Sequence, residues 1–118
     1  ERPVDAESVQ LALETWSQNH SMGDLPSAPK QPLTVVDRIQ PAVHLFADGE
    51  GFPVHPNPAK DLAAGMAVVV GNVTCPSSTT VRFEAYSHNT VRGAAGGVIF
   101  LAELAYWKGL VSTKPVHP

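Results

Sequence analysis

Apolar side chains recur at helical spacing near the start of the sequence. Over residues 5–19, the apolar positions that share one helix face are Val9, Ala12, Leu13 and Trp16. This period of about 3.6 residues predicts an amphipathic helix. Asp5 is placed as its N-cap, and Glu7 suits the positive end of the helix dipole. The apolar stripe requires another element to pack against.

Short apolar runs in the second half of the sequence predict two neighbouring strands. Residues 66–70 form a continuous run of β-branched character, and residues 81–86 alternate between apolar and charged side chains. The polar segment 74–80 joins the two runs and suits a hairpin loop. Two shorter runs, at residues 33–36 and 43–46, also predict strands.

Between the first helix and these strands, prolines interrupt every periodic pattern. They stand at positions 26, 29, 32, 41, 53, 56 and 58, and a turn cluster occupies residues 48–51. A stretch this long is unusual inside a compact domain, so residues 22–58 form either an arm laid over another surface or a partly mobile segment. We prefer the arm, and expect it to mediate self-association.

Residues 90–108 predict a second long helix, opened by Asn89 and Thr90 and ended by Gly109. Its aromatic side chains Tyr106 and Trp107 are expected in a core or an interface, because the helix exposes too much apolar area if left bare. The patterns together predict an α+β chain. It has a small mixed or antiparallel sheet of three to four strands, two packed helices and a long Pro-rich arm.

Composition and charge narrow the functional classes. The 118 residues are 43% apolar and 16% charged, against about 25% charged in the usual soluble domain, which favours a surface covered by a partner. The net charge of −3 and the isolated basic residues argue against nucleic acid. A single cysteine, Cys75, excludes an intrachain disulfide and favours a reducing compartment. Without a signal peptide or a membrane-length apolar run, a cytoplasmic chain is expected.

The segment 87–97 is rich in glycine and alanine where the second helix begins. Each interior glycine costs a helix about 1 kcal/mol relative to alanine, so a compensating role is required. One interpretation is the close approach of a ligand to the exposed amides at a helix N-terminus. The other is tight packing of the helix against the sheet. The residues alone do not decide between them.

The same segment carries a family resemblance. Ser-His-Asn-Thr-Val-x-Gly-Ala-Ala-Gly at residues 87–96, followed by Ala-Glu-Leu, resembles the C-terminal signature of aspartate-semialdehyde dehydrogenases of the archaeal and fungal type. Residues 25–32 are similar to the Leu-Pro-Ser-Ala-Pro segment of that family, residues 37–41 to its Arg-Pro-Gln-Pro arm, and residues 65–71 to its Gly-Met-x-Val-x-Val-Gly strand. Four ordered matches cover most of the chain.

The resemblance implies a division of the chain and a reaction. Residues 1–86 would belong to the dimerisation domain, and residues 87–118 would form the final helix, which in the family returns to the Rossmann domain. Enzymes of the family use NADPH to reduce an acyl phosphate to a semialdehyde, through a cysteine thioester assisted by a histidine and an arginine. All three groups lie upstream of the matched region, so we expect no catalytic residue here. Cys75, in a polar loop, is interpreted as an ordinary thiol.

The resemblance also implies a cofactor contact. Asn89, Thr90 and Gly93 match positions beside the nicotinamide of NADP in the family, and an Asn side chain offers a carboxamide both a donor and an acceptor. The alternative is that Asn89 or Thr90 simply caps the helix. His88 is interpreted as structural rather than as an acid or base. The remaining histidines show no metal-ligand spacing, so no metal site is expected: His20, His44, His55 and His117.

Two departures from the family pattern keep a second function open. Ala42 and Asn72 stand where the family usually has arginine, and residues 46–58 add length to the arm. The first hypothesis is a part of a semialdehyde dehydrogenase, acting as a homo-oligomer or with a complementary Rossmann-domain chain. The second is a repurposed dimerisation module that serves as a binding or scaffold protein. A third, a new enzyme using its own pocket, lacks a nucleophile and base.

Overall fold

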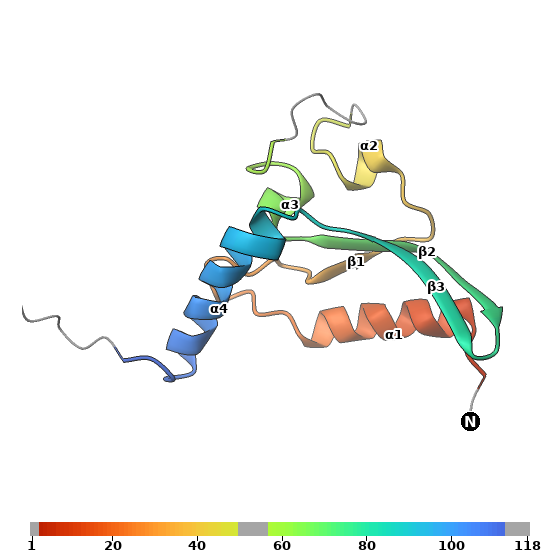
Figure 1. The fold of residues 1–118 in the computed structure, drawn as a ribbon, viewed down its shortest axis with the longest axis horizontal. Helices are drawn as coiled ribbons and strands as arrows, with labels where there is room; N and C mark the ends of the chain where they lie inside the picture. Colours follow the sequence, from red (N-terminus) through yellow and green to blue (C-terminus); the bar gives the residue numbers. More distant parts are fainter. Residues whose placement is uncertain (1–2, 50–56, 113–118) are drawn as a thin grey trace, which may run out of the picture.

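The computed structural model describes residues 3–49 and 57–112, and Figure 1 shows their arrangement. In chain order the elements are α1 (Ala6–Asn19), β1 (Leu33–Val35), α2 (Pro41–His44), α3 (Leu62–Gly65), β2 (Val68–Ser77), β3 (Thr80–Tyr86), the π-helical turn η1 (Val91–Ala95) and α4 (Gly96–Trp107). The sheet has the order β1-β2-β3. Because β1 is parallel and β3 antiparallel to β2, the sheet is mixed, and the predicted α+β class is confirmed.

The β2–β3 hairpin is longer than the sequence predicts. Ser77 pairs with Thr80, so the strands continue almost to the turn, and the prediction of a loop over residues 74–80 is wrong. Proline has no N–H to donate to a neighbouring strand, so within sheets it is found at edges and irregularities. Pro76 lies at such an irregularity, because the pairing register shifts between Thr74 and Ser77. Cys75 is half-buried on β2 rather than placed in a loop.

Helix α1 covers one face of the sheet (Figure 1). Asp5 caps it as predicted, with its Oδ1 accepting the Ser8 N–H at 2.9 Å. The buried residue of the helix is Ser17. Its hydroxyl donates to the Leu33 carbonyl at 2.8 Å and accepts the Leu33 N–H at 3.0 Å. The side of α1 that faces the sheet therefore includes the polar residue Ser17. Trp16, which was predicted on the buried side, is 47% exposed.

The arm covers the other face of the sheet, where α2 and α3 lie (Figure 1). Ile39, Leu45 and Val69 form the buried cluster there, and Val36, Phe46 and Leu62 pack around it. Residues 36–46 of the arm thus pack on the sheet to which β1 belongs. The strand predicted at residues 43–46 is wrong, because α2 occupies this region. Pro41 suits a first helical position, and the Gln40 N–H is satisfied by Nδ1 of His44 at 2.8 Å.

The short element α3 is a left-handed turn. Leu62, Ala63 and Ala64 have φ angles of 49°, 51° and 59°, and Gly65 follows at 77°. Left-handed backbone costs a non-glycine residue about 1–2 kcal/mol, so the surroundings must hold the turn in place. The buried carboxylate of Asp61 accepts N–H groups from Ala47 and Asn57, at 3.0 and 2.7 Å, and anchors the chain just before the turn.

Candidate functional site

His88 organises the turn between β3 and α4. Its Nδ1 accepts the Val91 N–H at 3.1 Å and lies 3.0 Å from the Thr90 hydroxyl. Its carbonyl accepts the Gly93 N–H at 3.1 Å. The structural interpretation of His88 therefore matches these contacts. The capping interpretation of Asn89 and Thr90 is wrong, because the Thr90 side chain makes no capping bond and His88 satisfies the first helical N–H instead.

The first turn of the predicted helix is a π-helix. The Ala95 N–H donates to the Thr90 carbonyl at 3.1 Å, five residues back, and the regular helix begins only at Gly96. The N–H groups of Val91 and Gly93 are already bonded to His88. These two amides are therefore not free for a ligand, as one of the two interpretations of this segment would require. The helix ends as predicted at Gly109, with a φ of 70°.

The glycines of the segment differ in how closely their surroundings pack. A Cβ on Gly96 would lie 2.7 Å from Met66 Sδ and 2.8 Å from Val91 Cγ1, so packing excludes a side chain there. On Gly93 the nearest atom would be the His88 carbonyl oxygen at an ordinary 3.9 Å. Packing therefore explains Gly96, while nothing within the described chain requires a glycine at position 93.

Asn89 lies next to this bare surface. Its side chain is exposed, and it makes no hydrogen bond to the residues that the structure describes. Gly93, Ala94 and Ala95 are exposed beside it and project almost no side-chain bulk. A carboxamide donor and acceptor beside an uncluttered helical turn is an arrangement that can take a flat polar ring.

The fold brings three distant glycine- and proline-rich segments together around the start of α4. A Cβ on Gly65 would lie 2.7 Å from Val91 Cβ. The Glu103 carboxylate accepts the Ser27 N–H at 2.8 Å and the Ser27 hydroxyl at 2.7 Å. A hollow of about 330 Å³ lies between residues 26–29, the α3 turn and Gly96. Segments 25–32, 65–71 and 87–97, which carry the family resemblance, are therefore neighbours in space.

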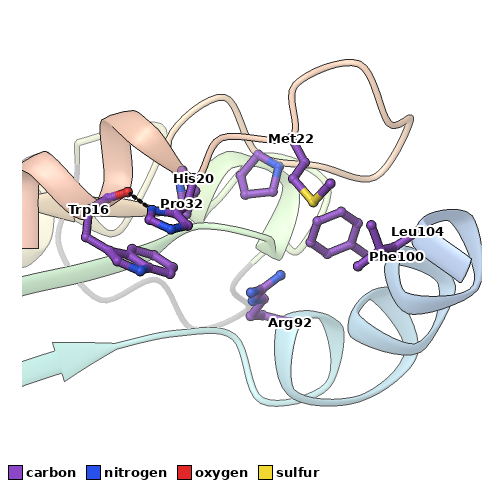
Figure 2. Close-up of a pocket in the computed structure, with 8 residues that line it drawn as sticks. Trp16, His20, Met22, Pro32, Arg92, Phe100 and Leu104 are labelled. Atoms are coloured by element: carbon purple, nitrogen blue, oxygen red, sulfur yellow. Dashed lines mark hydrogen bonds between the residues drawn. The ribbon is translucent and has the colours of Figure 1, made fainter. Parts of the chain in front are cut away.

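A second hollow, of about 270 Å³, opens on the other side of the same turn (Figure 2). Its lining residues are Trp16, His20, Met22, Pro29, Pro32, Arg92, Phe100 and Leu104. The Trp16 and His20 rings stack at 4.7 Å, and the Arg92 guanidinium lies 5.6 Å from the centre of the Phe100 ring. Sequence analysis missed this arrangement, because no local pattern links residues of the first helix to residues of the last.

Apart from Glu103, every side chain of helix α4 is apolar or aromatic, and none of its residues is buried. Val98, Leu101 and Trp107 are 66%, 64% and 64% exposed. An all-round apolar helix is normally buried, so its aromatic end does not belong to the core of the described chain.

Asn72 shows what replaces one of the arginines that the family usually has. It adopts a φ of 54°, which asparagine tolerates better than most residues. Its Nδ2 donates to Glu84 at 2.6 Å, and its Oδ1 accepts the Ile39 N–H at 3.3 Å. This residue therefore joins β2, β3 and the arm. Ala42, the other departure, is half-buried in α2.

No three His, Cys, Asp or Glu side chains within residues 3–49 and 57–112 come together as a metal site would require. Over the same residues, no helix combines the length and the apolar character needed to cross a membrane. His55 and His117 lie outside the described residues, as does most of the added length in the arm.

The chain is similar to a part of a malonyl CoA reductase and of several aspartate-semialdehyde dehydrogenases. It is 33% identical over 111 residues to the malonyl CoA reductase (NADP) of Metallosphaera sedula, covering 94% of the chain and 28% of that protein. It is 35% identical over 111 residues to the aspartate-semialdehyde dehydrogenase of Aspergillus fumigatus, covering 90% and 27%. The corresponding enzyme of Methanothermobacter thermautotrophicus is 33% identical over 102 residues, covering 85% and 26%.

No protein-family model matches the chain. The chain spans 26% to 28% of the length of these three relatives, and is a distant homologue of a part of them. A relation to semialdehyde dehydrogenases is therefore confirmed at this level.

Proposed function

We propose that the chain forms part of an NADP-dependent oxidoreductase of the semialdehyde dehydrogenase type, which reduces an acyl phosphate to a semialdehyde. Residues 1–86 contribute dimerisation surface, and residues 87–118 contribute the helix on the nicotinamide side of the active site. The chain supplies neither the cysteine nucleophile nor the assisting histidine and arginine. The relationship to the Aspergillus and Metallosphaera enzymes supports this assignment.

The observation that carries the proposal is the turn at residues 88–93. The Asn89 carboxamide makes no bond to the described residues, and Gly93 lacks a side chain where packing would allow one. These residues suit the carboxamide and ring of a nicotinamide, which would supply the hydride when bound. Asn89 would hold the carboxamide, Gly93 would leave room for the ring, and Thr90 would border it. His88 would keep the turn in this shape through its bonds to Val91 and Gly93.

The exposed surface of α4 supports the second half of the proposal. An apolar helix without a buried residue is stabilised by a covering surface. In a completed enzyme that surface would be the Rossmann domain, and the dimerisation surface would be provided by the sheet and arm. A homo-oligomer that lacks a Rossmann domain is the alternative assembly, and it would make this chain a binding or scaffold module.

The experiment is native mass spectrometry of the purified chain, alone and after pull-down from its source. Recovery of a stoichiometric partner with a Rossmann domain and a cysteine nucleophile would support the proposed enzyme, which would then be titrated with NADP. Asn89→Ala should weaken NADP binding about tenfold, because a well-placed hydrogen bond contributes roughly 1–1.5 kcal/mol. Asn19→Ala, an exposed asparagine at the end of α1, serves as the matched control.

Two outcomes would contradict the proposal. A clean homo-oligomer that binds no NADP would favour the binding module, which the absence of arginine at positions 42 and 72 also favours. Equal NADP affinity of the two asparagine variants would remove Asn89 from the cofactor site, even if the partner carries a Rossmann domain.

A further inference from the structure

We propose that the hollow between α1 and α4 is a binding site for a small organic carboxylate with a flat apolar body. The site lies beside the proposed nicotinamide turn but does not depend on it. Its polar group is Arg92, and its walls are the Trp16–His20 ring pair, Met22 and Phe100.

The position of Arg92 provides the charge. Its side chain is half-buried and forms no ion pair with any carboxylate in the described part of the chain; its recorded contact is the Phe100 ring at 5.6 Å. Figure 2 shows the side chain rising from the turn before α4 into the space between the Trp16–His20 pair and Phe100. A planar guanidinium with five N–H donors matches a carboxylate with two parallel hydrogen bonds. The hollow thus presents an unmatched anion-binding group.

The walls of the hollow select the rest of the ligand. His20 is held by stacking on Trp16 and by a 2.8 Å hydrogen bond from its Nδ1 to the Trp16 carbonyl, so the pair forms a fixed flat surface. Met22, Phe100 and Leu104 add apolar surface around it. Aromatic and thioether walls favour a flat or branched hydrocarbon body over a sugar or an inorganic anion.

The size of the hollow limits the ligand. Its volume of about 270 Å³ lies just below the ~300–1,000 Å³ range of small-molecule sites. A single aromatic acid fits this size better than a nucleotide does. Because Gly93 directly follows Arg92, a carboxylate on the guanidinium should also change the environment of the Gly93 amide.

The test is a nuclear magnetic resonance titration of the full chain with phenylacetate and with its neutral isostere phenylacetamide. The Trp16 indole N–H and the Arg92 side-chain N–H report on the hollow. The Trp107 indole, 64% exposed at the end of α4 and outside the lining, reports on non-specific binding. We expect a saturable shift of Trp16, and an affinity for the acid about tenfold or more above that for the amide, because hydrogen bonds to a charged group are the stronger ones.

A pair of arginine variants isolates the charge. Arg92→Gln should lower the affinity for phenylacetate about tenfold or more while leaving phenylacetamide unchanged. Arg82→Gln, on the exposed strand β3, should change neither. The proposal is overturned if acid and amide bind equally well, if the two variants weaken the acid equally, or if Trp16 shows no saturable shift. The comparison of acid with amide on the unaltered chain decides the question even if a variant unfolds.

Discussion

Replacing Glu103 should undock α4 from the loop that contains Ser27. The Glu103 carboxylate accepts the Ser27 N–H at 2.8 Å and its hydroxyl at 2.7 Å, and both residues are half-buried. A hydrogen bond to a charged group contributes about 1.5–3 kcal/mol, but partial exposure lets water replace part of it. We therefore expect Glu103→Ala to cost about 2 kcal/mol rather than the sum of two full bonds. Glu103→Gln should cost less, because its amide group can still bond to the serine.

The assay is hydrogen exchange of the Ser27 amide and of the α4 amides in the native chain. A loss of about 2 kcal/mol corresponds to a fall in protection of roughly 30-fold at Ser27. Glu14→Ala, the same substitution on an exposed face of α1, should leave protection within about twofold, as surface substitutions usually do. Protection of Ser27 that is equal in the two variants would refute the reasoning, and would mean that apolar packing alone holds α4 in place.

Four further substitutions, in three predictions, test the fold. Ser17→Ala removes two hydrogen bonds to Leu33 at a buried position. In a urea titration it should lower the free energy of unfolding by about 1–3 kcal/mol. A loss below about 0.3 kcal/mol would show that water or neighbouring groups replace these bonds. Ala64→Gly removes the backbone strain of a left-handed alanine, so the free energy of unfolding should stay unchanged or rise by up to about 1 kcal/mol. Ala12→Gly in the regular helix α1 should lower it by about 1 kcal/mol. Equal losses in the two variants would contradict the left-handed turn. The hydrogen bond from the Ser8 backbone N–H lowers the pKa of Asp5 in the folded chain. The ionised Asp5 carboxylate therefore stabilises α1 above the unfolded pKa of about 3.9. This stabilisation is lost as the pH falls through the lower folded pKa. The difference in helix content between the unaltered chain and Asp5→Ala should shrink below that pH, and a difference independent of pH would show that the carboxylate is not the cap.

The local patterns were sufficient where local chemistry decides structure. An N-cap depends on the residue's own side chain, and a helix stop at glycine depends on its own backbone freedom. The predictions of Asp5 as the N-cap and Gly109 as the end of the last helix are both confirmed. The strand at residues 43–46 was predicted wrongly because a four-residue apolar run fits a strand or a helix equally well. The core cluster at Leu45 and the proline at position 41 decided for the helix.

The candidate site shows the same division. The Asn89–Gly93 segment stands out in the sequence as a run of small residues, yet the sequence could not tell packing from ligand approach. The structure shows packing at Gly96, where a Cβ would meet Met66 and Val91, and no close neighbour at Gly93, whose approach by a ligand stays a prediction. The sequence did not predict that His88 accepts the Val91 N–H and so caps this turn, because histidine is not a common capping residue.

The sequence by itself determined the two long helices, the two neighbouring strands of the hairpin, the α+β class, the absence of an intrachain disulfide and the resemblance to semialdehyde dehydrogenases. These depend on periodicity, residue type and short motifs, all of which are local. Only the tertiary structure decided which residues face each other across long separations. Ser27 meets Glu103, Gly65 meets Val91, and Arg92 shares a hollow with His20. Such contacts depend on how α4 crosses the end of the sheet, and no spacing along the chain encodes that crossing.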